Sequence, residues 1–322
     1  MCKSLRIVFM GTPDFAVESL RALVEGGYNV VGVVTTPDRP IGKHQSVLSE
    51  CPVKKYAREK DIPTLQPEKL KDTAFLEQLA ELKADIQVVV AFRMLPEAVW
   101  VMPRFGTFNL HASLLPQYRG AAPINHAIMA GDTETGVTTF FLNHEIDRGE
   151  IILRRRISIS DTDDAGALHD ALMKLGAELV LETVDCIGSG KVGTIPQETL
   201  YDAATVLRTA PKLYTENCRI DWTMPMKEIY NFIRGLSPYP AAWTELISPG
   251  ENRVLKIYQT EKVPGVHTFT AGTLIIGKRN NIDVAVDGGY IRLQSLQMAG
   301  RKRMNVTDFL NGFRLEQDSR LT

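Results

Sequence analysis

Residues 5–14 read LRIVFMGTPD, and this stretch sets the fold at the start of the chain. Its first six residues are apolar except for one arginine, which predicts a strand. The turn that follows leads into residues 15–25, FAVESLRALVE, whose apolar residues recur at helical spacing. A strand that turns directly into a helix is the first half of a βαβ unit, so we expect a parallel sheet covered by helices.

The same alternation continues along the first half of the chain. Residues 29–35, 85–92 and 107–111 predict further strands, and residues 53–59 predict a helix. Strands separated by helices imply crossover connections. The sequence therefore predicts an α/β fold with a doubly wound, mostly parallel sheet of the Rossmann-like type.

After residue 116 the pattern changes. Residues 122–130 predict a helix, 136–142 and 150–158 alternate like a hairpin at the sheet edge, and 165–187 predict a long amphipathic helix. From there to about residue 207 the periodicity is weak. We therefore expect a first domain at 1–190 and a linker at 191–206.

The remaining residues, 207–322, predict a smaller second domain. A helix is expected at 226–234, followed by about five short strands that Gly, Asn and Asp interrupt: 242–247, 254–259, 271–276, 282–286 and 290–295. Several short strands in succession favour a small OB-like β-barrel.

Composition excludes several classes of protein. With 44% hydrophobic and 23% charged residues the chain is ordinary for a globular protein. Its four cysteines are scattered without a C-x-x-C pair, which argues against a zinc knuckle or a disulfide framework. No apolar run is long enough to span a bilayer. We therefore expect a cytoplasmic protein without a membrane partner.

The charges are unevenly distributed along the chain. Residues 1–206 carry 21 Lys and Arg against 27 Asp and Glu, a net charge of −6, whereas residues 207–322 carry 16 against 11, a net charge of +5. Lys and Arg supply contacts to phosphate, so the second part is the better candidate for binding nucleic acid. Uneven solvated surface charge would give the same count.

The turn at Gly11-Thr12-Pro13-Asp14-Phe15 lies where ligands bind in doubly wound sheets. It contains no G-x-G-x-x-G, and Pro13 lacks a backbone N–H for a phosphate. A tight turn at the start of a helix is the favoured interpretation.

The segment FNLHASLLP, residues 108–116, carries the strongest chemical signal. Asn109 and His111 project from the same face of a strand, because side chains alternate with a period of two. An amide can donate to an oxygen that becomes negative, and an imidazole can exchange a proton near neutral pH. Each residue alone also has an ordinary structural explanation.

Asp147 lies in the polar turn HEIDRGE, residues 144–150. A carboxylate there can hydrogen-bond the His111 imidazole, fix its tautomer and favour its charged form. An Asp that caps the turn before Gly149 is the alternative. A metal site made of His111, His144 and Asp147 is a weaker alternative, because the spacing matches no ligand motif and no cysteine joins it.

Taken together, these segments resemble the methionyl-tRNA formyltransferase family. The resemblance covers nearly the whole chain and rests on an ordered series of motifs: GTPDFAV (11–17), TPDRPIGK (36–43), CPVK (51–54), VVVAF (88–92), NLHASLLPQYRGAAPI (109–124), GDTETGVT (131–138), IDRGEII (146–152), RIDW (219–222), IRGLSPYPAAW (233–243) and SLQMAGRKRM (295–304). The resemblance implies that the set of Asn109, His111, SLLP (113–116) and Asp147 is shared by enzymes that take formyl from 10-formyltetrahydrofolate on this fold. The later motifs of the series indicate the appended barrel of the tRNA enzyme.

The resemblance implies a reaction and its catalytic residues. The α-amine of methionine on initiator tRNA attacks the formyl carbon of 10-formyltetrahydrofolate, with Asn109, His111 and Asp147 as catalytic residues. No metal is implied, and we expect a monomer. The alternative is a related folate enzyme that acts on a sugar nucleotide or glycinamide ribonucleotide, or that hydrolyses the formyl group. A non-catalytic RNA-binding module would be expected to have lost the catalytic residues.

The resemblance also implies binding residues. Folate contacts are expected from two segments: Val90, Ala91, Phe92 and Arg93, and Ser113, Leu114, Leu115 and Pro116. The loop 38–54 resembles the insertion that reaches into the acceptor stem, with Arg39, Lys43 and Lys54 as tRNA contacts. This loop is less basic than is usual in the family. The folate-side loop 92–96 is one residue shorter than the common version, and Arg93 there meets folate or points to solvent.

Overall fold

The computed structural model describes residues 2–41, 47–248, 251–277, 281–315 and 319–322. The chain forms two compact units, and each is made of several segments. The first unit contains Met1–Gly120, Thr135–Ile157 and His169–Thr209, and the second contains Ala121–Glu134, Ser158–Leu168 and Ala210–Thr322. Residues 121–134 and 158–168 thus group with the second unit, and the segment expected to be a linker groups with the first.

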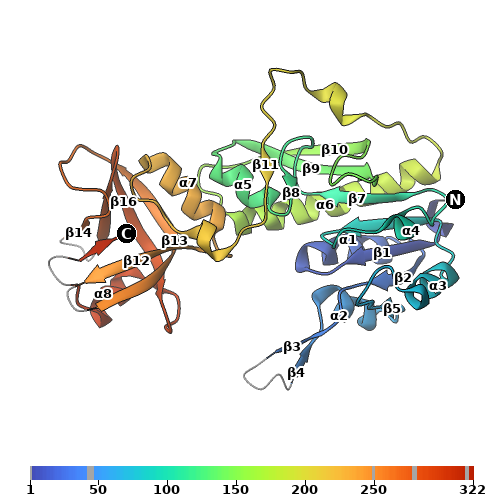
Figure 1. Ribbon diagram of the computed structural model, residues 1–322, viewed down its shortest axis with the longest axis horizontal. Coiled ribbons are helices and arrows are strands. Elements are labelled where there is room, and N and C mark those ends of the chain that lie inside the picture. Colours follow the sequence, from blue (N-terminus) through green and yellow to red (C-terminus); the bar gives the residue numbers. More distant parts are fainter. Residues whose placement is uncertain (1, 42–46, 249–250, 278–280, 316–318) are drawn as a thin grey trace. The chain divides into compact units, whose positions relative to one another are not determined.

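A seven-stranded sheet forms the centre of the first unit (Figure 1). Its order is β10-β9-β7-β6-β1-β2-β5, and the strands are β1 (Ile7–Gly11), β2 (Val30–Val34), β5 (Thr64–Leu65), β6 (Ile86–Val90), β7 (Thr107–His111), β9 (Glu134–Phe141) and β10 (Ile151–Ser158). The five strands from β5 to β7 pair in parallel, and β9 is antiparallel to β7. The predicted mostly parallel sheet, with its hairpin at the edge, is confirmed.

The burial of the strands explains why these residues form a parallel sheet. Every residue of β1 and of β6 is buried, as expected where helices cover both faces. The helices of this unit are α1 (Asp14–Glu25), α2 (Pro52–Glu59), α3 (Thr73–Glu81), α4 (Glu97–Trp100) and most of α6 (Ala165–Gly188). On α6, Gly176 faces the Leu110 side chain of β7, and Thr183 Oγ1 lies 2.9 Å from Thr139 Oγ1 of β9. Contact with α6 thus fixes β7 and β9.

The remaining short elements are spread along the chain. They are η1 (Cys2–Ser4), β8 (Arg119–Gly120), α5 (Pro123–Met129), η2 (Gln197–Leu200), β11 (Thr209–Ala210) and η3 (Thr215–Cys218). Among the described residues, no helix combines the length and the apolar composition that a membrane crossing requires.

The expected insertion loop contains a small hairpin. Strands β3 (Arg39–Ile41) and β4 (Val47–Ser49) pair antiparallel and extend away from α2 (Figure 1). At its base, Asp38 accepts hydrogen bonds from Lys54 Nζ and from Gln66 Nε2, the latter at 2.9 Å. These bonds attach the hairpin to α2 and to the segment that follows β5.

The second unit is built on an antiparallel sheet that curls into a nearly closed barrel. Its order is β14-β15-β16-β13-β12-β18, with β17 also paired to β16. The strands are β12 (Ala242–Ser248), β13 (Glu251–Pro264), β14 (Leu274–Ile276), β15 (Ile282–Val286), β16 (Gly289–Met298), β17 (Met304–Asn305) and β18 (Arg320–Leu321), and the helices are α7 (Met226–Leu236) and α8 (Val306–Gly312). The prediction of a small β-barrel is confirmed.

Two contacts join the edge strands of this sheet, β14 and β18. Thr273 bridges to Arg320, and Leu321 N donates to Gly272 O at 2.9 Å, so β18 closes the barrel beside β14. Gly272 has a φ of +84°, and a Cβ there would lie 2.2 Å from Leu321 O. Only glycine permits this approach. The interior is apolar and includes Trp222, whose Nε1 donates to Thr244 Oγ1 at 2.9 Å.

Candidate active site

Asn109 and His111 lie at the carboxyl end of β7, where doubly wound sheets bind their ligands. They are two residues apart in the strand and therefore share a face of the sheet. His111 is 6% exposed, and Asn109 is half-buried. Within the described part of the chain, no side-chain hydrogen bond involves the Asn109 amide. That amide is available to a ligand.

The backbone sets the tautomer of His111. Its Nε2 lies 2.9 Å from the carbonyl oxygen of Tyr118, and because a carbonyl only accepts, Nε2 carries the hydrogen and donates it. In the neutral ring, Nδ1 then has a free lone pair. Nδ1 lies 3.9 Å from Asp147 Oδ2, which is too far for a hydrogen bond. The direct bond expected from the sequence is absent, although the two side chains are neighbours.

The main chain orients the carboxylate of Asp147. Gly120 N donates to Oδ2 at 2.9 Å, and Asp147 itself is left-handed with a φ of +54°. Non-glycine residues seldom adopt this conformation, although Asp and Asn tolerate it best. Gly149 lies so close to β9 that a Cβ would be 1.6 Å from Phe141 O. The turn is thereby pressed against the sheet next to His111.

Two side chains hold the backbone of this turn. Gln197 Nε2 donates to Asp147 O and to Gly149 O, both at 2.9 Å. Gln197 Oε1 accepts from Arg119 Nη2 at 2.6 Å and from Arg119 Nε at 3.1 Å. Arg119 Nε also reaches Asp147 O at 3.1 Å. Sequence reasoning missed Gln197, because an isolated Gln in a weakly periodic segment forms no recognisable pattern.

The predicted folate segment 113–116 is held by hydrogen bonds to its own neighbours. Ser113 Oγ donates to Gln117 O at 2.6 Å, and Thr138 links Ser113 O to Leu115 N. Ser113, Leu115 and Pro116 are buried, and Leu114 is partly exposed. Leu114 is therefore the side chain of this segment best placed to contact a ligand.

The second predicted folate segment follows β6. Val90 is buried in the sheet, Ala91 is exposed with a φ of +47°, and Phe92 is half-buried. The partly exposed Arg93 guanidinium donates to the carbonyl of Glu68 at 2.8 Å and to that of Pro67. Burial lowers the pKa of Arg93. Its role in the structure is to anchor the segment after β5.

The predicted tRNA residues have different environments. Arg39 lies in β3, and Lys43 lies outside the described residues. Lys54 forms an ion pair with Asp38 and lies 3.9 Å from Glu50. The hydrogen bond from Gln66, followed by that from Lys54, lowers the pKa of Asp38. Lys54 thus supports the base of the hairpin.

The three residues of the metal alternative do not come together. His144 stacks edge-on against Trp100 and lies 3.7 Å from Glu97, whereas His111 faces Asp147. Over the residues that the structure describes, no group of three His, Cys, Asp or Glu is arranged to hold a metal ion.

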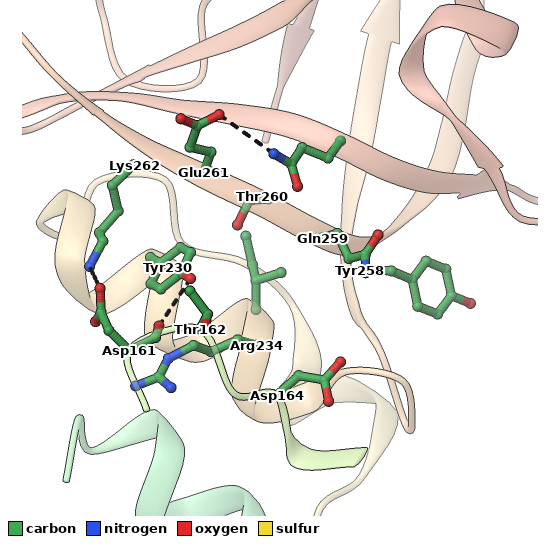
Figure 2. Close-up of a pocket in the computed structure, with 12 residues that line it drawn as sticks. Asp161, Thr162, Asp164, Tyr230, Arg234, Tyr258, Gln259, Thr260, Glu261 and Lys262 are labelled. Atoms are coloured by element: carbon green, nitrogen blue, oxygen red, sulfur yellow. Dashed lines mark hydrogen bonds and ion pairs between the residues drawn. The ribbon is translucent and has the colours of Figure 1, made fainter. Parts of the chain in front are cut away.

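A separate cavity of about 370 Å³ lies in the second unit. Figure 2 shows Lys262 and Asp161, two of its lining residues, pointing toward each other. Lys262 Nζ lies 2.7 Å from Asp161 Oδ2. The hydrogen bond from Lys262 lowers the pKa of Asp161. Tyr230 Oη donates to Asp161 O at 3.1 Å, and Arg234 Nη1 donates to the carbonyls of Ser160 and Asp163. These bonds join residues 158–168 to the barrel and explain why that segment groups with the second unit.

The folds of the two units agree with comparisons to known proteins. Residues 5–184 match the formyl transferase family, and residues 212–314 match the formyl transferase C-terminal domain. The chain is 66% identical over 313 residues to the methionyl-tRNA formyltransferase of Parabacteroides distasonis, covering 97% of each chain. It is 62% identical over 320 residues to that of Phocaeicola vulgatus, covering 99% of each.

Solved structures share the fold at low identity. HypX from Aquifex aeolicus in complex with tetrahydrofolic acid has a TM-score of 0.64 at 16% identity, covering 95% of this chain and 47% of that one. An N-formyltransferase from Helicobacter canadensis has a TM-score of 0.62 at 19% identity, covering 90% and 99%. By sequence, the chain belongs to the formyl transferase family and, over nearly its whole length, to the methionyl-tRNA formyltransferases.

Proposed function

We propose that this chain transfers the formyl group of 10-formyltetrahydrofolate to the α-amino group of methionyl initiator tRNA. The observation that carries the proposal is the arrangement of Asn109, His111 and Asp147 at the carboxyl end of β7. The relatives named above, which span nearly the whole chain, support the choice of acceptor.

In the proposed mechanism the methionine α-amine attacks the formyl carbon. The lone pair on His111 Nδ1 accepts the proton that the amine loses, since Nε2 is committed to Tyr118 O. The Asn109 amide donates to the oxygen that becomes negative. Collapse of the tetrahedral intermediate breaks the bond to the folate nitrogen, which takes up the proton held on His111 Nδ1 and so returns the imidazole to its neutral form. The Asp147 carboxylate, 3.9 Å from Nδ1, stabilises the imidazolium in between.

The proposed folate site lies between the two segments predicted from the sequence. The peptide groups of Val90, Ala91 and Phe92 and the side chain of Leu114 supply its contacts. Arg93 and the buried Ser113, Leu115 and Pro116 hold these segments in shape. In this proposal folate recognition depends mainly on backbone groups.

The proposed tRNA contacts are Arg39, Lys43 and Lys54 of the loop 38–54 and basic residues of the region 207–322. The net charge of +5 over these residues supports the second assignment. We further propose that the chain acts as a monomer in the cytoplasm, where aminoacylated initiator tRNA is used.

Incubation with 10-formyltetrahydrofolate and methionyl initiator tRNA tests the proposal. Formylmethionine should appear on the tRNA, and it should not appear when folate is omitted. His111→Ala should abolish the reaction while leaving the affinity for charged tRNA nearly intact. Transfer to a sugar nucleotide with none to tRNA would replace the proposed acceptor, and full activity of the His111 variant would refute the mechanism.

A further inference from the structure

The segment that follows α6 contacts the backbone groups that hold the side chains of His111 and Asp147 in place. At its start, Gln197 is fully buried and binds the carbonyls of Asp147 and Gly149. Its amide oxygen accepts two hydrogen bonds from Arg119. All polar atoms of this side chain are therefore used, and a charged donor strengthens the network.

At its other end the same segment holds Tyr118, whose carbonyl binds His111. Tyr118 N donates to Arg208 O at 2.7 Å, and Arg208 Nη1 donates to Tyr118 Oη at 2.9 Å. The Gln117 side chain accepts from Arg208 N at 2.9 Å and donates to Val206 O at 3.1 Å. Tyr118 O is in turn the acceptor for His111 Nε2. Displacement of residues 206–208 would therefore displace the group that fixes the His111 tautomer.

Asp147 needs an external support of this kind. Its left-handed backbone costs on the order of 1–3 kcal/mol and persists only where surrounding bonds impose it. Gln197 supplies two of those bonds, from 50 and 48 residues away in sequence. A buried amide that lost its partners would itself be destabilising, so Gln197 and the turn hold each other in place.

We infer that residues 197–208 form a positioning clamp, in which Gln197 fixes Asp147 and the 206–208 backbone, through Gln117 and Tyr118, fixes His111. The inference rests on the proposed function, since the clamp acts on that site. Gln197 touches neither substrate in this proposal. It sets the distance between the imidazole and the carboxylate, on which stabilisation of the imidazolium depends.

The matched variants are Gln197→Met, which keeps the length of the side chain and removes its hydrogen bonds, and Glu198→Ala, which changes the exposed neighbour. Gln117→Met removes the two side-chain hydrogen bonds at the other end of the clamp, to Arg208 N and Val206 O, and leaves the Tyr118–Arg208 bonds in place. We expect both clamp variants to lower kcat, by up to about 100-fold, with the KM for tRNA and for folate nearly unchanged. Glu198→Ala should retain wild-type kcat.

A second readout does not depend on activity. The ring-nitrogen NMR signals of His111, assigned by their loss in His111→Asn, should shift in Gln197→Met and in Gln117→Met but not in Glu198→Ala. Thermal melting identifies variants that fail to fold. If only one of Gln197→Met and Gln117→Met folds, that variant decides whether the clamp exists. Unchanged His111 signals and kcat in a folded clamp variant would overturn the clamp. Absence of formylation by the wild-type protein would instead refute the proposed function. The NMR comparison of the variants would still test the clamp in that case.

Discussion

Asp147 meets two requirements at once, a left-handed backbone and a carboxylate that accepts from Gly120 N. Asn109, His111 and Asp147 could be proposed from the sequence, because their side chains carry recognisable chemistry within a motif. Tyr118 and Gly120 could not, since they contribute a carbonyl and an N–H that every residue type shares. The sequence also suggested a direct bond between His111 and Asp147, which the 3.9 Å separation excludes.

Replacement of Asp147 should separate fold from chemistry. Asp147→Asn keeps a side chain that tolerates the left-handed region, so its melting temperature should stay near wild type while kcat falls at least about 100-fold. Asp147→Ala should lose activity and also about 1–2 kcal/mol of stability. Calorimetry and single-turnover formylation measure the two effects. Near-normal activity of Asp147→Asn would show that the charge is not needed.

Asn109→Ala should slow the chemical step alone. Loss of an oxyanion donor costs about 10²–10³ in kcat. Because the Asn109 amide has no hydrogen-bond partner among the residues that the structure describes, the unfolding free energy should not fall. A raised KM with an unchanged kcat would instead assign Asn109 to substrate binding.

At the scale of elements, the helices and strands formed by long apolar or amphipathic runs could be predicted from the sequence. Strands of two or three residues could not. The expected strand 107–111 coincides with β7, and the expected helix 165–187 matches α6 to within one residue. Strands of two or three residues, such as β3, β17 and β18, are too short for a period to show. Strand β13 runs well beyond its expected range of 254–259, and its register with β16 shifts near Gln259. Such irregularities are set by the partner strand.

Closure of the barrel should depend on Gly272. Gly272→Ala adds left-handed strain to a clash with Leu321 O, whereas Gly190→Ala adds only the strain, because nothing lies within 4 Å of a Cβ at Gly190. We expect the second variant to lose about 1 kcal/mol and the first distinctly more. Hydrogen exchange at Leu321 N should accelerate only in Gly272→Ala. Equal losses in the two variants would exclude the clash as a cause.

The base of the β3–β4 hairpin should weaken in acid. Because the pKa of Asp38 is lowered in the folded protein, its bonds to Gln66 and Lys54 stabilise the fold above the pKa of the unfolded chain. That stability is lost as the pH falls through the lowered value. The difference in unfolding free energy between wild type and Asp38→Asn, at most about 1 kcal/mol at pH 7, should vanish in strong acid. A pH-independent difference would contradict this.

At the scale of the whole molecule, the charge difference between the two parts of the chain could be counted from the sequence, but the interleaved composition of the units could not. Residues 158–168 join the second unit because the buried Arg234 binds two of their carbonyls. Backbone acceptors have no sequence signature, so a boundary drawn from periodicity alone misses them.

Affinity for tRNA should fall steeply with salt. Each phosphate that the basic residues neutralise adds about 0.7–0.9 to the slope of log affinity against log salt. Filter binding between low and physiological salt measures this slope, and the KM for folate serves as the control. A flat response would argue against a binding surface made of Lys and Arg.

The proposed catalytic residues His111 and Asp147 are anchored to main-chain groups at positions 118 and 120. Substitution of side chains around the site can therefore leave its geometry intact, as long as the backbone of the loop that contains positions 118 and 120 keeps its conformation. A lineage can change what it formylates without reinventing how it formylates. For an engineer, the loop path is the part to preserve, and the exposed side chains nearby are the part to vary.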